Sequence, residues 1–176
     1  MTDTINRRLW VAVVVVLLAG QASCVADQGS SFGRAASDAV VPFLAVGELA
    51  IFFDGVRGKQ AAWQGAKALA VTAATTAFLK YTVRERRPNS DSLTSFPSGH
   101  TSAAFAMATV VADYNHKYTV PAYGVAAVIG WSRVDVGSHY WWDVLAGAAL
   151  GHVAAKQFTK SSIAFSPQGI RYAWTW

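Results

Sequence analysis

The sequence predicts an all-α protein, a bundle of about five core helices that follows a signal peptide or anchor helix and ends in a short β-like tail. Two observations support this prediction. Hydrophobic residues make up 53% of the chain and charged residues only 14%, against about 25% charged residues in a typical soluble domain. Apolar segments rich in Ala, Val and Gly, each long enough for a helix, alternate with short polar or Gly-containing breaks. The length of 176 residues fits one domain.

Residues 1–26 are interpreted as a signal peptide or an N-terminal anchor. Arg7 and Arg8 precede an apolar run over Leu9–Gly20, and small residues follow the run. A positive, an apolar and a small-residue region in this order are typical of a secretory signal. An uncleaved anchor is the alternative, although its length is near the lower limit for a membrane span. In both cases the positive flank stays in the cytoplasm and the rest of the chain faces outward.

The polar, Gly/Ser-rich residues 27–37 are interpreted as a linker, and the helical domain is placed at 38–158. Asp38 is the candidate N-cap of a first helix that runs to about Phe53. Four more helices are expected over roughly residues 60–83, 97–113, 120–134 and 140–158. Polar residues interrupt these segments, so each one alone is a marginal membrane span.

The C-terminal tail, residues 159–176, departs from the helical pattern. Its last residues alternate between larger apolar side chains and other types, which is the period of a strand: Ile170, Tyr172, Trp174 and Trp176 alternate with Arg171, Ala173 and Thr175. Pro167, Gln168 and Gly169 predict a turn before this strand. A hairpin is therefore expected, either as a packing flap or as an aromatic edge at a membrane interface.

The charge of the chain indicates an anionic partner without naming it. The formal net charge is +5 and the pI is about 9.6. Nucleic acid is not the expected partner, because the basic residues are scattered apart from Lys80–Arg87 and no nucleic-acid-binding motif is present. The single cysteine, Cys24, can form no internal disulfide and has no metal-ligand spacing around it.

The first segment of chemical interest is Lys80–Pro88. Lys80 and Arg87 are seven positions apart, which is about two helical turns, so a helix would place them on one face. Two cations on one face can hold a dianion, and the planar guanidinium fits phosphate oxygens. Taken alone, the pattern also fits a solvated basic helix end.

The second segment is Phe96–Thr101, at the expected start of the third helix. Proline suits a first helical position, and the Ser98 hydroxyl can donate a hydrogen bond. Gly99 lets backbone amides approach an anion, which a helix N-terminus also attracts. His100 would lie at the rim, where it could supply a proton. An ordinary capped helix start explains the proline and serine, but it explains the Gly-His pair poorly.

The third segment is Ser132–Asp143. His139 and Asp143 are four positions apart and would be adjacent on one helical face. An aspartate that accepts a hydrogen bond from one ring nitrogen fixes the tautomer and frees the other nitrogen as a nucleophile or base. The alternative is a surface His–Asp pair of the kind that many helices carry.

Together and in this order, the three segments resemble the motif of the type 2 phosphatidic acid phosphatase family. That motif reads Lys-x6-Arg-Pro, then Pro-Ser-Gly-His, then Ser-Arg-x5-His-x3-Asp, and this sequence matches every fixed position. The resemblance covers roughly residues 38–158. Agreement at so many spaced positions is far more specific than any one of the segments.

The resemblance implies a helical fold and a metal-independent phosphoryl-transfer site without cofactors. His139 would attack phosphorus to form a phosphohistidine, Asp143 would orient His139, and His100 would protonate the leaving oxygen and then activate water. The groups expected to bind the phosphate are Lys80, Arg87, Ser98, the amide of Gly99, and Arg133. Cations and amides would stabilise the charge that a metal carries in other enzymes.

The leading functional hypothesis is a phosphatase of lipid phosphates or diphosphates in the cell envelope, in the inner membrane with the site facing the periplasm. A soluble periplasmic acid phosphatase of broad specificity is the alternative. A vanadium haloperoxidase shares the pocket but is expected to be longer. A lipid phosphotransferase would use the same phosphohistidine, and a non-enzymatic binding protein would not need the complete motif.

Overall fold

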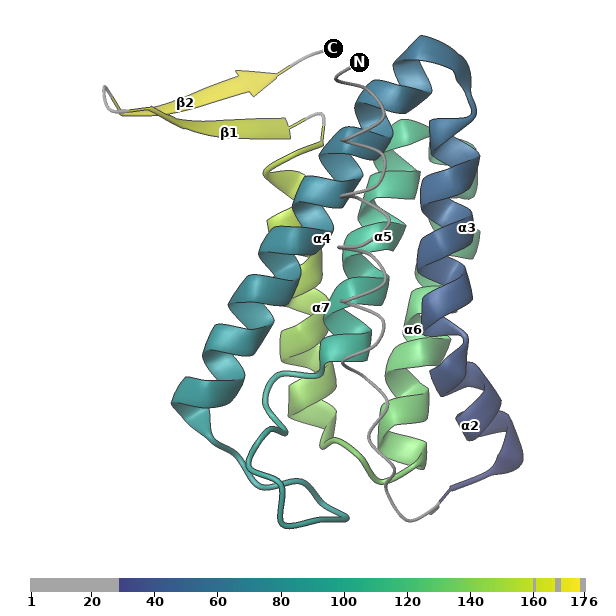
Figure 1. The fold of residues 1–176 in the computed structure, drawn as a ribbon, viewed down its shortest axis with the longest axis vertical. Helices are drawn as coiled ribbons and strands as arrows, with labels where there is room; N and C mark the ends of the chain where they lie inside the picture. Colours follow the sequence, from purple (N-terminus) through teal and green to yellow (C-terminus); the bar gives the residue numbers. More distant parts are fainter. Residues whose placement is uncertain (1–28, 160, 167–168, 175–176) are drawn as a thin grey trace, which may run out of the picture.

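The computed structural model describes residues 29–159, 161–166 and 169–174, so the predicted signal or anchor segment lies outside the described residues. The described chain forms a helical bundle and a short hairpin (Figure 1), which confirms the predicted fold class. Its helices are α2 (Ser31–Asp38), α3 (Val40–Phe52), α4 (Gly55–Val83), α5 (Gly99–Tyr114), α6 (Thr119–Asp135) and α7 (Trp141–Lys156). A 3-10 turn, η1 (His116–Tyr118), joins α5 to α6.

The prediction of a linker over residues 27–37 is wrong from Ser31 onward, because these residues form α2. Ser30 is the N-cap, and its Oγ accepts a hydrogen bond of 2.9 Å from the Gly33 amide. The amide and hydroxyl of Ser30 also donate to Asp135 Oδ2 at 3.0 Å and 2.7 Å. A serine cap and a carboxylate from the end of α6 thus stabilise a helix in a polar segment.

Asp38 does not cap the next helix, as the sequence predicted, but ends α2. Ala39 separates α2 from α3. Pro42, in the first turn of α3, has no N–H to donate to the Asp38 carbonyl, so one continuous hydrogen-bond ladder cannot form here. The proline therefore accounts for the break between the two helices.

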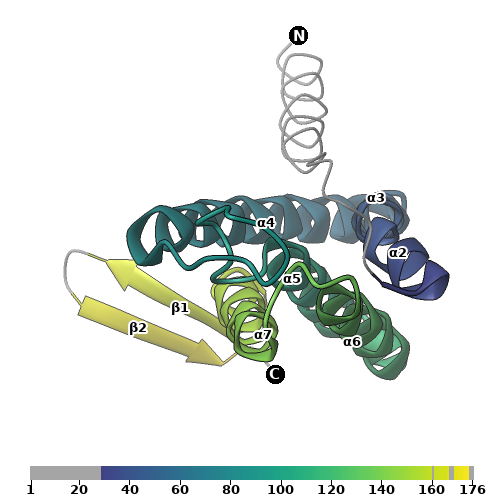
Figure 2. The same ribbon diagram turned by 90° about the horizontal axis from the view of Figure 1, so that it is seen from below.

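Helix α5 lies at the centre of the bundle, in contact with α3, α4, α6 and α7 (Figures 1 and 2). Two apolar clusters pack on its two sides. Ala104 and Ala108 pack with residues of α3 and α6, whereas Ala106 and Val110 pack with residues of α3, α4 and α7. The small side chains of α5 let four helices approach one axis.

Two glycines bring α7 against α5 at backbone distance. A Cβ on Gly151 would lie 2.0 Å from the Ser102 carbonyl oxygen, and a Cβ on Gly147 would lie 2.7 Å from the Ser98 carbonyl oxygen. Both contacts are shorter than a methyl group allows. Glycine at these two positions therefore sets the spacing of α5 and α7.

The C-terminal hairpin consists of β1 (Ser161–Ser166) and β2 (Gly169–Trp174), which pair antiparallel (Figure 1). The register joins Ser161 to Trp174 and Ser166 to Gly169. The pairing of the two strands confirms the predicted hairpin. The predicted turn at Pro167 and Gln168 lies outside the described residues.

Candidate active site

The three segments singled out in the sequence meet at one end of the bundle. The end of α4, the start of α5, the end of α6 and the start of α7 lie together at the lower end of Figure 1, which Figure 2 views directly. The candidate residues interact electrostatically. The pKa of His100 is lowered by the charges of four of them: Arg133, His139, Arg87 and Lys80.

Lys80 is held by the loop that precedes α5. Its Nζ donates to the carbonyl oxygens of Thr94 at 2.6 Å and Ser95 at 3.1 Å. Burial, followed by repulsion from Arg87, lowers the pKa of Lys80 to about 8, although Asp143 acts in the opposite direction. Only neutral carbonyls contact this ammonium group, so a bound anion would stabilise its charged form and raise its pKa.

The prediction that Lys80 and Arg87 share one helical face is wrong. Helix α4 ends at Val83, and Arg84 adopts a left-handed conformation with φ of 53°. The chain therefore turns before Arg87, whose amide donates to the Ser92 carbonyl. The guanidinium of Arg87 reaches the site from the loop, and its buried Nε has no hydrogen-bond partner among the described residues.

Arg133 is the most buried of the three cations, with 8% of its surface exposed. Its Nη1 donates to the hydroxyl of Ser37 on α2, while its Nε is buried without a hydrogen-bond partner in the described part of the chain. Burial and then repulsion from Arg87 lower the pKa of Arg133 to about 10. A buried guanidinium donor without an acceptor destabilises the fold, unless a ligand accepts its hydrogen bond.

His139 and Asp143 form the predicted pair, but not on one helical face. Helix α7 begins only at Trp141, so His139 lies in the turn before it and Asp143 in its first turn. Nδ1 of His139 is 3.4 Å from Asp143 Oδ2. This contact leaves Nε2 on the other side of the ring, available to an electrophile.

Both members of the pair are buried and tuned by their surroundings. Burial lowers the pKa of His139 to about 4, although the hydrogen bond with Asp143 opposes this effect. Burial would raise the pKa of Asp143, but hydrogen bonds from His139, Ser95 and the Tyr140 amide together lower it. At neutral pH the site therefore holds a neutral imidazole beside a carboxylate.

The start of α5 faces the same site. Ser98 is its N-cap, so the helix begins at Gly99, two residues later than Pro97. The Ser98 amide donates to the Asp143 carbonyl at 3.0 Å, and its hydroxyl oxygen accepts from Thr101 at 2.9 Å. The Ser98 hydroxyl proton stays available to an acceptor, beside first-turn amides that have no partner within the helix.

His100 lies in the first turn of α5 and is half-buried. Burial and then the positive charge of Arg133 and His139 lower its pKa to about 3. Arg87 and Lys80 act in the same direction. At neutral pH this imidazole is uncharged, because it is desolvated by burial and faces three cations.

Sequence reasoning missed several residues that support the site. Ser37 holds Arg133, and Ser95 donates from its hydroxyl to Asp143 Oδ2 at 2.5 Å. Glu85 accepts a hydrogen bond of 2.8 Å from the indole of Trp142. None of these belongs to the three spaced motifs, although Ser95 lies three positions before Ser98. Proximity to that motif was the only signal in the sequence.

No group of three or more His, Cys, Asp and Glu side chains suited to a metal ion occurs among the residues described. The donors that converge at the site are instead cationic or amide N–H groups. These groups fit the oxygens of an anion.

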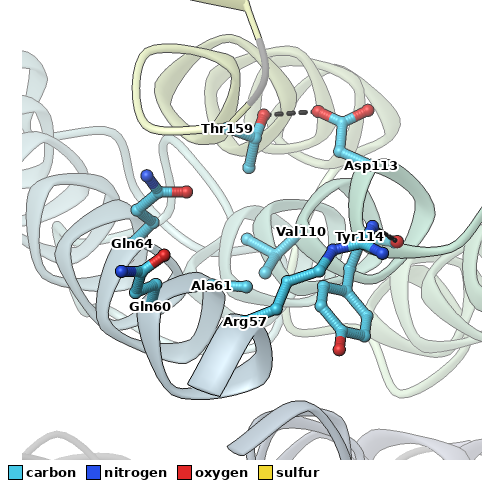
Figure 3. Close-up of a pocket in the computed structure, with 8 residues that line it drawn as sticks. All are labelled: Arg57, Gln60, Ala61, Gln64, Val110, Asp113, Tyr114 and Thr159. Carbon is cyan, nitrogen blue, oxygen red and sulfur yellow. Dashed lines mark hydrogen bonds between the residues drawn. The ribbon is translucent and has the colours of Figure 1, made fainter. Parts of the chain in front are cut away.

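A second polar cluster lies at the opposite end of the bundle, where a cavity of about 160 Å³ opens between α4, α5 and the end of α7 (Figure 3). Asp113 accepts from Lys156 at 2.6 Å and from the Thr159 hydroxyl. Arg57 donates to the Tyr114 carbonyl at 3.3 Å and lies 5.1 Å from the centre of its ring. The lining residues are Arg57, Gln60, Ala61, Gln64, Val110, Asp113, Tyr114 and Thr159.

Comparison with known families follows the same lines as the geometry. The model of the PAP2 superfamily matches residues 61–164, which include all three motif segments. The chain belongs to the PAP2 superfamily. The resemblance to type 2 phosphatidic acid phosphatases seen in the sequence is thereby confirmed.

The PAP2 chain is similar to proteins named lipid A 1-phosphatase. It is 34% identical over 121 residues to the protein from Porphyromonas gingivalis, covering 64% of this chain and 27% of that relative. It is 42% identical over 57 residues to the protein from Rhizobium etli, covering 32% of this chain and 25% of the relative. The matched region thus spans about a quarter of the length of these relatives.

The fold is similar to the crystal structure of LpxE from Aquifex aeolicus. The TM-score is 0.55 at 23% sequence identity, covering 68% of this chain and 82% of that chain. This likeness supports the helical PAP2 fold independently of the motif residues.

Proposed function

We propose that this chain is a phosphatase that removes a phosphoryl group from a phosphorylated lipid through a phosphohistidine on His139. The observation that carries the proposal is a set of three cations, one buried and two half-buried, around a neutral histidine whose Nδ1 faces a carboxylate. Such an arrangement attracts a phosphate and places a nucleophilic nitrogen beside it.

In the first step, Nε2 of His139 attacks phosphorus and the bond from phosphorus to the leaving oxygen breaks. Lys80, Arg87 and Arg133 stabilise the charge on the phosphoryl oxygens, together with Ser98 and the Gly99 amide. Asp143 accepts from Nδ1–H and stabilises the positive charge that develops on the ring.

His100 delivers the proton that the leaving oxygen needs. The negative charge of a bound phosphate offsets the cations that depress the pKa of His100, so the occupied site favours its protonated form. In the second step, neutral His100 takes a proton from water, the resulting hydroxide attacks phosphorus, and the P–N bond to His139 breaks. Phosphate leaves, and both histidines return to their starting states.

A lipid substrate is supported by the surroundings of the site. The relatives are named lipid A 1-phosphatases. Trp141 and Trp142 lie next to His139 and are 52% and 54% exposed, a position in which tryptophan often meets a membrane interface. We propose a membrane lipid phosphate as the substrate class, with a phosphatidyl or lipid A phosphate as the first compounds to test.

Association with a membrane is supported by the stretch Ser31–Phe52, which is long and apolar enough to cross a bilayer. An 18-residue window within it has a mean hydropathy of 1.6, and only 28% of that window is buried within the protein. Val46, Leu49 and Phe53 expose more than half of their surfaces along this stretch and its end. We place the protein in the cell envelope, with the site facing the periplasm.

The test compares the parent protein with His139→Ala and with His116→Ala, which removes an exposed histidine at the other end of the bundle. Membrane and soluble fractions are assayed with EDTA for phosphate release from a lipid phosphate and from a soluble phosphomonoester. We expect membrane-bound activity on the lipid that is lost in His139→Ala and retained in His116→Ala. A phosphoryl label on His139 should be lost in acid, since phosphohistidine is acid-labile.

Several results would contradict the proposal. Activity that survives in His139→Ala would exclude His139 as the nucleophile. Activity on both substrates that is confined to the soluble fraction would favour a soluble acid phosphatase. Phosphate transfer to a lipid hydroxyl without release would indicate a phosphotransferase. Peroxide-dependent bromination with vanadate, in place of hydrolysis, would indicate a haloperoxidase.

A further inference from the structure

The loop before α5 contains a serine that contacts the first and third motif segments and directly precedes the second. Ser95 is fully buried, and its hydroxyl donates to Asp143 Oδ2 at 2.5 Å. Its carbonyl accepts from Lys80 at 3.1 Å, and its amide donates to the Glu85 carbonyl at 2.9 Å. Ser95 thus links the end of α4, the approach to α5 and the first turn of α7.

The contacts of Asp143 show why this hydroxyl matters. Oδ2 receives three donors: the Ser95 hydroxyl at 2.5 Å, the Tyr140 amide at 3.0 Å and His139 Nδ1 at 3.4 Å. Oδ1 is buried and has no hydrogen-bond partner in the described part of the chain. The bond to Ser95 is the shortest of the three, so it contributes most to fixing the plane of the carboxylate.

The Ser95 hydroxyl is also near the histidine itself. Its Oγ is 3.5 Å from His139 Nδ1, at the outer limit of a hydrogen bond. Because Ser95 donates its proton to Asp143, any proton between Oγ and Nδ1 must come from the ring. The arrangement therefore favours the tautomer with hydrogen on Nδ1 and an unprotonated Nε2.

We infer that Ser95 is a positioning residue for phosphoryl transfer, which holds the Asp143 carboxylate where it orients the attacking face of His139. This inference rests on the proposed function, because it assigns to Ser95 a part in the same reaction. The Ser95 hydroxyl donates to Asp143, so its part in the reaction is exerted through that carboxylate.

The charged and titratable groups that face Asp143 come from three directions: His139 from the turn before α7, Lys80 from α4 and Arg87 from the loop. All of them remain when Ser95 is changed. The hydrogen bond from Ser95 lowers the pKa of Asp143, so removing that bond raises it and the carboxylate takes up a proton at higher pH. The acid limb of the rate profile should then move to higher pH.

The experiment measures pH profiles of kcat and KM on a lipid phosphate for the parent, Ser95→Ala and Ser95→Cys. The cysteine keeps the approximate volume of serine but donates weakly. We expect kcat to fall about 10- to 100-fold, as loss of one strong hydrogen bond to a charged group implies. KM should change by less than about threefold, since binding residues are untouched.

Thr109→Val is the matched control. It removes a fully buried hydroxyl, which contacts the Tyr123 hydroxyl at 2.8 Å. Thr109 lies on α5 ten positions after Gly99, far from the site along that helix. We expect this variant to lower the melting temperature without moving the pH profile. The parent measured in parallel separates the two proposals, because an inactive parent would contradict the proposed function and not the role of Ser95.

An active parent with an unchanged kcat and acid limb in both Ser95 variants would overturn the inference. So would an equal loss of kcat in Thr109→Val and the Ser95 variants without a shift of the acid limb, because a general loss of stability would then explain both. If Ser95→Ala does not fold, Ser95→Cys alone decides between these outcomes.

Discussion

The two ends of the bundle both carry charged side chains, but they use them differently. At the end with Asp113, the two carboxylates have donors: Lys156 and Thr159 donate to Asp113, and Tyr114 donates to Asp54. At the end with His139, the cations contact carbonyls and a hydroxyl, and buried guanidinium nitrogens lack partners within the described residues. Paired charges make a stable structure, whereas unmet donors make a site that an anion can complete.

The largest expected effect comes from breaking the unpaired end. Arg133→Ala should lower kcat/KM about 10²- to 10³-fold, because one buried donor to the developing charge is lost. The matched change at the other end, Arg57→Ala, should leave kcat/KM within about twofold. Phosphate release from a lipid phosphate measures both. Equal losses in the two variants would contradict the contrast between the ends.

The second prediction concerns pH. His139 must be neutral to attack, and its pKa of about 4 sets an acid limb there. Lys80 must stay charged to bind, and its pKa of about 8 sets a basic limb. The pKa of His100 is about 3 in the free enzyme, so the proton that His100 delivers has to enter with the substrate. kcat/KM should therefore fall below about pH 4, and above about pH 8 at the latest. A profile that stays level from pH 3 to pH 10 would contradict both assignments.

A smaller effect is expected from Ser37, which holds the guanidinium of Arg133 from α2. Ser37→Ala should raise KM by about three- to tenfold with little change in kcat, because loss of a hydrogen bond to a charged group loosens a binding residue. Ser31→Ala, at the exposed start of the same helix, is the control. Steady-state kinetics of the two variants decide the matter; a KM rise in both would point to α2 as a whole.

The smallest effect on activity is expected at Asp113. Asp113→Asn should lower the free energy of unfolding by about 1–2 kcal/mol, because Lys156 and Thr159 lose a charged acceptor. kcat/KM should stay within about twofold of the parent. Thermal unfolding in detergent and the lipid phosphate assay measure the two quantities. A large loss of activity at full stability would show that the two ends are coupled.

The helical fold and the grouping of the site residues could be predicted from the sequence, because both depend on patterns that the chain displays locally. Apolar segments with polar breaks mark the helices, and the spaced motif marks Lys80, Arg87, His100, Arg133 and His139. Their electrostatic coupling agrees with the prediction that they share a site. The roles assigned to the individual residues stay predictions.

Local geometry was harder to predict. The spacing of Lys80 and Arg87 fits a helix, yet Arg84 ends α4 between them. The spacing of His139 and Asp143 also fits a helix, yet α7 starts between those two. Helix ends depend on caps and tertiary contacts that periodicity does not reveal.

Supporting residues could not be predicted either. Ser37 and Ser95 are ordinary serines in the sequence, and their importance comes from partners at distant positions, Arg133 and Asp143. The helix α2 was missed for the same reason, since its first turn depends on Asp135 from the end of α6. Contacts of long sequence separation leave no periodic trace.

The glycine contacts between α5 and α7 have a consequence for the stiffness of the site. Gly151 and Gly147 bring backbone against backbone, so no side chain lies between the two helices there to change rotamer and alter their spacing. Ser98 lies at the start of α5 and Asp143 at the start of α7. The Ser98 amide donates to the Asp143 carbonyl, and this hydrogen bond holds the two helix starts in register. We therefore expect the side of the site formed by α5 and α7 to be rigid. Adjustment to substrates of different shape would then come from the side chains of the α4–α5 loop.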